Sequence, residues 1–256
     1  MKLLFFTYLL LIPVMYADYI DHPDSKKIMQ ELVEVHGFEK SYVEDVFKNA
    51  TKQQKIIDSI SKPAEFTWTW ERYKKLFIED KRIRNGKKFI KQNIDTLNRA
   101  EEEFGVPKEI IVSILGVETR YGKIMGGYRV IDSLTTLGFD YPRRSAFFKD
   151  ELIKFFLLAR ENNLDIYSIK GSYAGAMGYG QFISSSYRAY AVDFDGDDNV
   201  DLFNSVDDAI GSIANYLKVH GWKKNGKIVT KSIPNNVREI YKPHDSLSKF
   251  IPLSFN

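Results

Sequence analysis

The stretch from residue 105 to residue 122, GVPKEIIVSILGVETRYG, ends an apolar helical pattern with an acid. The apolar positions recur with the spacing of one helical face and are Ile110, Ile111, Ile114 and Leu115. Pro107 is typical of the first turn of a helix, and Gly122 is typical of a C-cap. Glu118 comes four residues after Ile114 and therefore continues the apolar face. The pattern predicts a helix whose last turn directs a carboxyl group toward the protein interior.

A carboxyl group in such a position is a candidate general acid. Desolvation disfavours the charged form of an acid, so its pKa rises and the group stays protonated near neutral pH. The alternative is a structural glutamate that an arginine or a backbone donor holds in place. Buried carboxylates mark functional sites often but not always, so the pattern around Glu118 leaves both interpretations open.

The composition is that of an ordinary globular protein. The chain has 256 residues, of which 44% are hydrophobic and 28% charged, and this is enough to build the core of one large domain or two small ones. The formal net charge of +3 suits an anionic polymer as a partner but falls short of a nucleic-acid-binding signature. Lysines and arginines gather between Arg72 and Lys91, which we interpret as a solvated helical face. We therefore expect no nucleic-acid partner.

Residues 1–17 have the pattern of a secretory signal peptide. One positive residue, Lys2, precedes an uncharged apolar stretch that is shorter than the roughly 20 residues a membrane-spanning helix needs. We expect export, with residues 18–256 as the mature domain. An uncleaved anchor stays open, because Met15 stands where a cleavage site prefers a small residue. The chain has no cysteine, which excludes disulfides, a cysteine-based zinc site and a lipoprotein anchor.

Helical periodicity dominates the rest of the chain, and no long alternating strand pattern competes with it. We predict a mainly α fold with helices over residues 26–36, 42–60, 70–79, 88–104, 107–121, 145–161 and 206–220. The stretch KKNGKIVTK, residues 223–231, combines an Asn-Gly turn signal with β-branched residues. It predicts a small β-hairpin region near the C-terminus.

Several familiar chemistries lack their motifs. The four histidines are scattered without an HExxH pair, and no GxSxG motif is present. The glycines of GAMGYG follow no predicted strand, which argues against a dinucleotide-binding site. We therefore expect no organic cofactor.

The glycine-rich stretch GSYAGAMGYGQF, residues 171–182, leaves its backbone open to close approach by a ligand. Ser172 and Gln181 frame it with hydrogen-bonding groups, and Tyr173 or Tyr179 offers an aromatic face. Such a mixed lining is typical of sugar recognition. The alternative is a tightly packed structural turn.

The acidic stretch DFDGDDNVDLFNSVDD, residues 193–208, predicts a calcium loop. Oxygen-bearing side chains occupy alternate positions, as in the first part of an EF-hand: Asp193, Asp195, Asp197, Asn199 and Asp201. Asp198 replaces the expected glycine, and Asn204 replaces the glutamate that closes the usual loop. Asp207, three residues later, could close a longer loop. Close carboxylates repel one another unless a cation neutralises them, so we favour Ca²⁺ over a solvated acidic loop.

Together these stretches resemble the lytic murein transglycosylase B family of bacterial cell-wall enzymes. The resemblance runs from about residue 26 to 222 and rests on GVPKEIIVSILGVETRYG, on GSYAGAMGYGQFISSSYRAYAVDFDGDDNVDLF and on SIANYLKVHGW. It implies a lysozyme-like helical core with Glu118 as the single catalytic acid. It also implies groove-lining roles for Tyr73, Ser172 and Gln181. The implied calcium ligands are Asp193, Asp195, Asp197, Asn199 and Asp207.

The resemblance further implies cleavage of the bond between N-acetylmuramic acid and N-acetylglucosamine, with formation of a 1,6-anhydromuramyl product. Most glycosidases use two carboxyl groups, but here the N-acetyl group of the substrate could replace the second one. Asp132 and Asp140 stay open as candidates for a second carboxyl group, because they are close to Glu118 in the chain. A muramidase that uses water is an alternative with the same substrate. The expected setting is the periplasm, with peptidoglycan strands as the partner, possible contacts to cell-wall synthesis or division proteins, and a monomeric state.

The end of the chain departs from the family pattern. Family members continue into a final helix that completes the groove, and the stretch HDSLSKFIPLSFN, residues 244–256, resembles no part of that helix. We therefore expect a groove that lacks one wall. This departure keeps a second hypothesis open, in which the protein binds peptidoglycan and calcium without cleaving the glycan.

Overall fold

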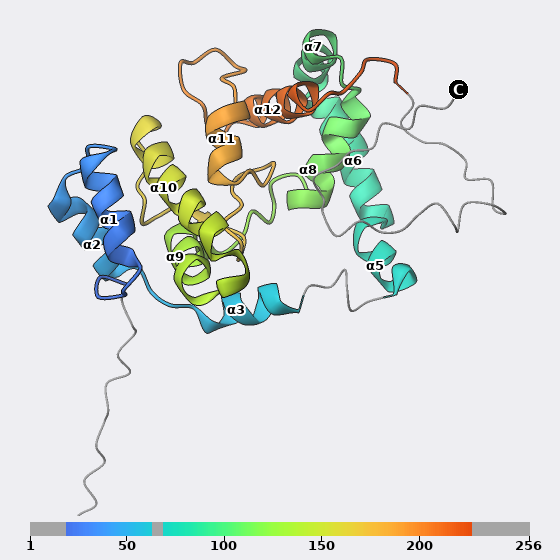
Figure 1. Cartoon of the computed structure of the whole chain (residues 1–256). Helices are drawn as coiled ribbons and strands as arrows, with labels where there is room; N and C mark the ends of the chain where they lie inside the picture. The colour runs from blue at the N-terminus through green and yellow to red at the C-terminus, as the bar shows by residue number, and fades with distance from the viewer. Residues whose placement is uncertain (1–18, 63–68, 227–256) are drawn as a thin grey trace, which may run out of the picture. The chain divides into compact units, whose positions relative to one another are not determined.

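Helices make up most of the chain in the computed structural model, which describes residues 19–62 and 69–226 (Figure 1). In chain order they are α1 (Ser25–Glu34), α2 (Lys40–Asn49), α3 (Gln54–Ser61), α5 (Trp70–Phe77), α6 (Asp80–Gln92), α7 (Ile94–Phe104), α8 (Lys108–Thr119), α9 (Val130–Asp140), α10 (Ser145–Glu161), α11 (Ser184–Tyr190) and α12 (Val206–Val219). A 3₁₀ turn spans Pro142–Arg144, and the strands β1 (Tyr128–Arg129) and β2 (Lys170–Gly171) form one antiparallel pair. The prediction of a mainly α fold is confirmed.

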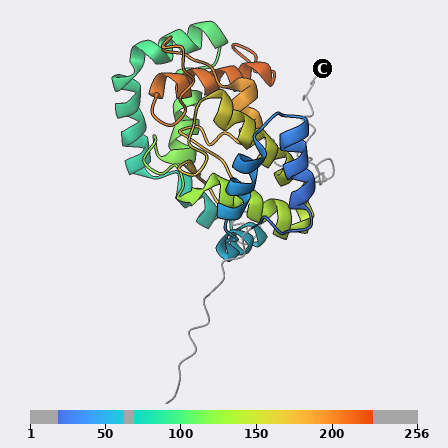
Figure 2. The same cartoon turned by 90° about the vertical axis from the view of Figure 1, so that its left-hand side faces the viewer.

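All of these elements belong to one structural unit, residues 1–224, and residues 225–256 form a second unit. Within the first unit α9 packs along α10, and α10 also contacts α11. On another side of the same unit α8 packs on α6, and α12 packs on α7 and α8 (Figures 1 and 2). The predicted signal peptide lies outside the described residues. The predicted β-hairpin at residues 223–231 does so from residue 227 onward, and the described part, 223–226, contains a turn.

Two predicted helices are each divided in the structure. The range 42–60 contains the end of α2, a loop and α3, because the backbone at Ala50 and Gln53 is extended. The range 88–104 contains the junction of α6 and α7 at Asn93, whose side-chain amide donates to the carbonyl of Phe89 at 2.9 Å. This bond to a local carbonyl is an alternative that asparagine offers to a continuous helix. Both predictions of single helices are therefore wrong.

The sequence patterns also missed α9 and α11. Ten consecutive residues of α9, Val130–Phe139, are buried, so this helix has no polar face and no amphipathic period. Ser133 and Thr135 donate their hydroxyl groups to backbone carbonyls of the preceding turn, Thr135 to the carbonyl of Ile131 at 2.8 Å. The hydroxyl of Thr136 instead accepts from the amide of Gln53 at 3.1 Å. Helix α11 is only seven residues long, which is too short for a clear pattern.

A sharp reversal of the chain ends α8. The helix stops at Thr119, and Arg120 and Tyr121 both take left-handed backbone angles, with φ of 53° and 63°. The predicted C-cap at Gly122 is therefore wrong, since the cap is Arg120. The reversal folds the Tyr121 ring back under the helix, where a Cβ atom added to Gly116 would lie 2.6 Å from the tyrosine hydroxyl. That hydroxyl donates to the carbonyl of Arg82 on α6 at 2.8 Å.

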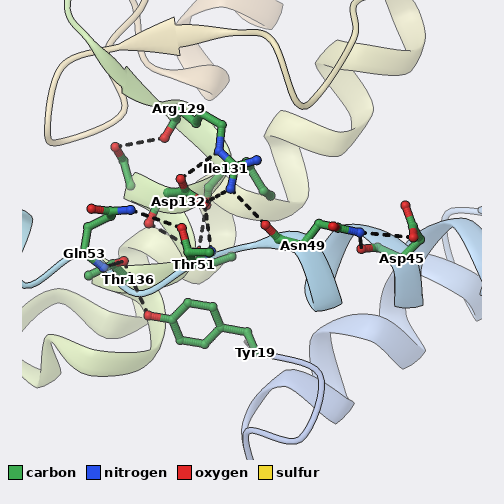
Figure 3. A network of polar contacts seen from close by, with 11 residues as sticks. Tyr19, Asp45, Asn49, Thr51, Gln53, Arg129, Ile131, Asp132 and Thr136 are labelled. Atoms are coloured by element: carbon green, nitrogen blue, oxygen red, sulfur yellow. Dashed lines mark hydrogen bonds and ion pairs between the residues drawn. The ribbon is translucent and has the colours of Figure 1, made fainter. Parts of the chain in front are cut away.

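An ion pair between the buried Asp132 and the partly exposed Arg129 ties the start of α9 to the segment between α2 and α3 (Figure 3). The carboxylate of Asp132 is 4% exposed and accepts hydrogen bonds from Arg129 Nε at 2.8 Å and Nη2 at 2.7 Å. Asp132 Oδ1 also accepts from the amide of Thr51 at 2.9 Å, and Arg129 Nη2 donates to the carbonyl of Asn49 at 2.8 Å. These bonds satisfy the polar groups that the loop brings against α9.

We expect Asp132→Ala to lower the free energy of unfolding by about 2–3 kcal/mol, because it leaves Arg129 and the Thr51 amide without their shared acceptor. Urea unfolding followed by circular dichroism measures the change. The matched control is Asp150→Ala on α10, which removes an exposed pair with Lys154 and should cost less than about 0.5 kcal/mol. Equal losses in the two variants would contradict the role given to Asp132.

Candidate active site

Glu118 lines a cleft of about 380 Å³ that is formed by α8, the segment before α11, α11 and α12. The lining residues are Ile114, Glu118, Gly180, Gln181, Phe182, Ile183, Ser186, Ile213, Tyr216 and Leu217. Most of these side chains are apolar or aromatic, and a few polar groups converge among them. This is the usual composition of a site that binds a small molecule or a segment of a polymer.

The side chain of Glu118 opens into the cleft and is exposed, so the prediction that it points into the interior is wrong. The buried face of α8 consists of Ile111, Val112, Leu115, Gly116 and Thr119. Glu118 lies at the border of this face, beside the partly buried Ile114. Neighbouring residues of a helix point in different directions, so Thr119 lies in the core while Glu118, one residue earlier, lies in the cleft wall.

The environment of Glu118 nevertheless changes its acidity. Loss of hydration in the cleft raises the pKa of Glu118 above its ordinary value, and no compensating charge opposes this effect. The carboxyl group therefore keeps its proton to a higher pH than a fully hydrated glutamate does. Among the described residues that line the cleft, Glu118 is the one acid.

Thr119 fixes the end of α8 against the glycine-rich segment. Its hydroxyl donates to the carbonyl of Tyr179 at 2.8 Å, and the amide of Gly122 donates to the same hydroxyl at 2.9 Å. A Cβ atom at Gly122 would lie 1.9 Å from the Tyr179 ring, so only glycine permits this approach. Sequence reasoning missed Thr119, although it directly follows the predicted acid.

Of the three predicted groove residues, Gln181 lines the cleft with Glu118. Its backbone is left-handed, with φ of 52°, and its Nε2 donates to the carbonyls of Gly178 at 3.0 Å and Met125 at 3.2 Å. These bonds fix the segment between the glycines against the loop that follows α8. Gln181 thus shapes the cleft wall opposite the end of α8.

Ser172 and Tyr73 do not line this cleft. The hydroxyl of Ser172 accepts hydrogen bonds from the amides of Ala174 at 3.2 Å and Ala176 at 3.1 Å, and so shapes the glycine-rich turn. Tyr73 lies on α5, with its ring 4.9 Å from that of Phe77. The structure therefore supports a structural role for the first part of the glycine-rich stretch and a cleft-lining role for its end.

The sequence analysis missed the contributions of α11 and α12, which are Ser186, Ile213, Tyr216 and Leu217. Ile213 and Tyr216 are three residues apart and share one face of α12. The motif SIANYLKVHGW contains both residues, but the pattern itself gives no sign that this face meets Glu118.

The two candidates for a second carboxyl group are engaged elsewhere. Asp132 pairs with Arg129, and Asp140 accepts a hydrogen bond from the Tyr19 hydroxyl at 2.6 Å and pairs with Lys52. Neither lines the cleft. A mechanism in which Asp132 or Asp140 assists Glu118 therefore has no support in this geometry.

Three predicted calcium ligands come together in the acidic loop. Carboxylate oxygens of Asp193, Asp195 and Asp197 lie within 4.8 Å of one another. Asp198 takes the left-handed conformation expected at the sixth position, with φ of 67°, and its amide donates to Asp193 Oδ2 at 2.8 Å. Hard oxygen ligands on a loop of this geometry fit Ca²⁺.

The other two predicted ligands are placed differently. Asp207 is outside the three-carboxylate cluster, and its Oδ1 accepts a hydrogen bond from the Thr96 hydroxyl at 2.7 Å. Asn199 is exposed, and its backbone N–H donates to Asp197 Oδ1 at 2.9 Å.

Asp208, which the sequence analysis did not select, is the buried anchor of this loop. It accepts from the amides of Phe194 and Asp201, each at 2.7 Å, and burial raises the pKa of its carboxyl group. The Asp208 carboxylate therefore links the two ends of the loop by hydrogen bonds.

We expect Glu118→Gln to stabilise the protein at about pH 7 and to change its stability little at about pH 4. Because the folded pKa of Glu118 is raised, the folded state binds more protons than the unfolded state between the two pKa values. Stability therefore falls as the pH rises from the unfolded pKa, about 4.3, through the folded pKa. The neutral amide lacks this penalty.

Urea unfolding of both proteins at the two pH values measures this difference. Glu102→Gln, which replaces an exposed acid on α7, is the control and should show no gain specific to neutral pH. A Gln variant at position 118 that is no more stable than the parent at neutral pH would refute the desolvation of Glu118.

The comparisons with known proteins give a consistent family. The model of the transglycosylase SLT domain matches residues 21–249. The chain is 41% identical to membrane-bound lytic murein transglycosylase B of Escherichia coli (strain K12) over 240 residues, which cover 88% of this chain and 66% of that relative. The chain thus spans about two thirds of the length of this relative. In the part of the chain that the structure describes, no helix combines the length and apolar character needed to cross a membrane.

Solved structures confirm the helical fold. The soluble lytic transglycosylase SltB1 from Pseudomonas aeruginosa is 49% identical, with a TM-score of 0.77 over 80% of this chain and 69% of that one. The E. coli lytic transglycosylase Slt35 in complex with calcium is 43% identical, with a TM-score of 0.77 over 83% and 68%. SltB3 from P. aeruginosa in complex with NAG-anhNAM-pentapeptide is 28% identical, with a TM-score of 0.69 over 79% and 54%. The chain therefore belongs to the transglycosylase SLT domain family of lytic transglycosylases, as the resemblance of its motifs predicted.

Proposed function

We propose that this protein is a lytic transglycosylase that cleaves the β-1,4 bond between N-acetylmuramic acid and N-acetylglucosamine in peptidoglycan and leaves a 1,6-anhydromuramyl product. One observation carries the proposal: Glu118 has a raised pKa, and it is the single carboxyl group among the described residues that line the cleft. The names of the relatives support the reaction, and the anhydromuramyl ligand bound by SltB3 supports the product.

The chemistry uses one carboxyl group twice. Neutral Glu118 protonates the glycosidic oxygen, so the bond from that oxygen to the muramyl C1 breaks and positive charge develops at C1. The ionised carboxylate then takes the proton of the muramyl C6 hydroxyl while that oxygen bonds to C1. The proton returns to Glu118, and no water is consumed. The N-acetyl group of the substrate stabilises the positive charge in place of a second carboxylate.

Tyr73, Ser172 and Gln181 are the proposed groove residues. Gln181 is supported by its place in the Glu118 cleft. Ser172 acts by shaping the turn through its bonds to Ala174 and Ala176, and Tyr73 offers an aromatic face on α5. Aromatic and amide groups of this type match the C–H faces and hydroxyl groups of an extended glycan.

We also propose a structural calcium ion in the acidic loop, held by Asp193, Asp195, Asp197, Asn199 and Asp207. The cluster of three carboxylate oxygens supports the first three ligands. Asp207 uses Oδ1 for the Thr96 hydroxyl, which leaves Oδ2 for the ion. The ion would neutralise the mutual repulsion of the carboxylates. The proposed setting is the periplasm, after export by the segment 1–17.

Digestion of purified peptidoglycan followed by mass spectrometry of the soluble products tests the reaction. We expect products that end in 1,6-anhydromuramic acid, and we expect Glu118→Gln to lower their rate of formation by at least about 10²-fold. Reducing-end muramic acid in place of the anhydro product would establish a muramidase instead. A folded protein that sediments with peptidoglycan but releases nothing would refute catalysis and leave a binding protein.

Calcium removal tests the metal proposal. At about 100 times its Kd, a bound ion adds about 2.7 kcal/mol to the stability, which corresponds to a rise of roughly 5–10 °C in Tm. Thermal unfolding with Ca²⁺ and with a chelator measures this rise. We expect Asp195→Ala to abolish it.

The matched control for the metal proposal is Asp198→Gly, which removes one charge from the same loop at a position that is not a proposed ligand. Glycine also accepts the left-handed backbone there, so this variant should keep the response to Ca²⁺. A Tm that does not respond to Ca²⁺ in the parent protein would exclude the site.

A further inference from the structure

Tyr216, on the wall of the Glu118 cleft, has its ring enclosed by three other rings. His220 stacks on it with the ring centroids 4.0 Å apart and an interplanar angle of 24°. Tyr190 and Phe182 meet the Tyr216 ring edge-on, at 5.2 Å and 5.8 Å. Helix α12 and the segments around α11 thus share one aromatic cluster. Two of its members, Tyr216 and Phe182, also line the cleft.

His220 is exposed, and a backbone contact orients its imidazole ring. It is the C-cap of α12, and its Nδ1 lies 2.7 Å from the carbonyl of Tyr216. Because a carbonyl only accepts, Nδ1 carries the proton in this contact. The edge of the imidazole also packs against Tyr190 at 4.8 Å.

Trp222, two residues after His220, fixes the C-terminal end of α12. The amide of Trp222 donates to the carbonyl of Leu217 at 2.9 Å, and its indole Nε1 donates to the carbonyl of Gly105 at 2.9 Å. Gly221 provides the left-handed turn between them, with φ of 92°. The end of α12 is therefore anchored to the segment that precedes α8, the helix that carries Glu118.

We propose that His220 is a positioning residue that fixes the Tyr216 ring in the cleft wall, so that this ring can pack against a sugar of the glycan strand. The inference rests on the proposed function, because it assumes a glycan in the Glu118 cleft. A ring that is already immobilised loses less conformational freedom when it packs against a ligand, which strengthens binding without any direct contact from His220. Three rings packed on Tyr216 provide this immobilisation.

Binding experiments in the Glu118→Gln background test the proposal without dependence on catalysis. The ligand is a purified peptidoglycan tetrasaccharide without peptide stems. Isothermal titration calorimetry should show roughly 3- to 10-fold weaker binding of this ligand for His220→Ala, the range expected for one lost aromatic pair. His220→Phe keeps a ring but lacks the donor, and should restore most of the affinity. His220→Asn keeps a donor but lacks the ring, and should not restore it.

The matched control is His22→Ala, which also removes a histidine from an aromatic cluster, at 5.0 Å from Phe139, on a part of the protein that does not line the cleft. It should leave glycan affinity unchanged. In the catalytically competent protein, His220→Ala should raise KM by a similar factor and leave kcat within about twofold. The positioning role would be overturned if His220→Ala, His220→Phe and His220→Asn bound the glycan with equal affinity. It would also be overturned if His220→Asn alone restored the affinity.

An NMR measurement tests the stack directly. The chain has four histidines, so the imidazole resonances of His220 can be assigned from the His220→Phe spectrum. At 4.0 Å the Tyr216 ring current shifts these resonances, and Tyr216→Leu should remove the shift. An unchanged shift in Tyr216→Leu would refute the stack. Failure of the Glu118→Gln protein to bind any glycan would instead refute the proposed function.

Discussion

The reversal after α8 is the constraint on which the candidate site depends. The Tyr121 ring occupies the space left by the absent side chains of Gly86 and Gly116, and its hydroxyl bonds to the carbonyl of Arg82. This packing holds the two left-handed residues that end the helix after Thr119, one residue beyond Glu118. Such backbone conformations are unfavourable for non-glycine residues and persist where the surrounding packing determines them. The position of the acid therefore follows from a contact between two helices and one ring.

Thr119 carries the same constraint to the other side of the cleft. Its hydroxyl links α8 to the carbonyl of Tyr179, while Gln181 links the glycine-rich segment to Met125 in the loop after α8. In the first link α8 donates to the glycine-rich segment, and in the second that segment donates to the loop after α8. The two hydrogen bonds together hold the acid and the opposing wall against each other. In the proposed reaction a single acid donates and then accepts a proton, and such a wall would keep both reacting oxygens within hydrogen-bond reach of it.

The local motifs were readable from the sequence because each rests on one residue type at a fixed spacing. The alternating acids predicted the cluster of Asp193, Asp195 and Asp197, and the apolar run before Glu118 predicted α8. Features that depend on tertiary packing were not readable. Helix α9 is buried on all sides, so its sequence has no alternation of polar and apolar faces. Glu118 is exposed although the next residue, Thr119, is buried, and the apolar pattern does not separate these two positions. The contribution of Tyr216 arises only because α12 packs beside α8.

Asp208 gives the acidic loop a property that the ligand positions alone do not. Its buried carboxylate accepts backbone amides from both ends of the loop, at Phe194 and Asp201. The arrangement of the three clustered acids is thereby set by covalent and hydrogen-bonded connections within the protein. The proposed calcium ion would therefore remove little chain entropy on binding, and its affinity would depend mainly on the loss of its own water shell. Selectivity among cations would then reflect how readily each ion gives up water.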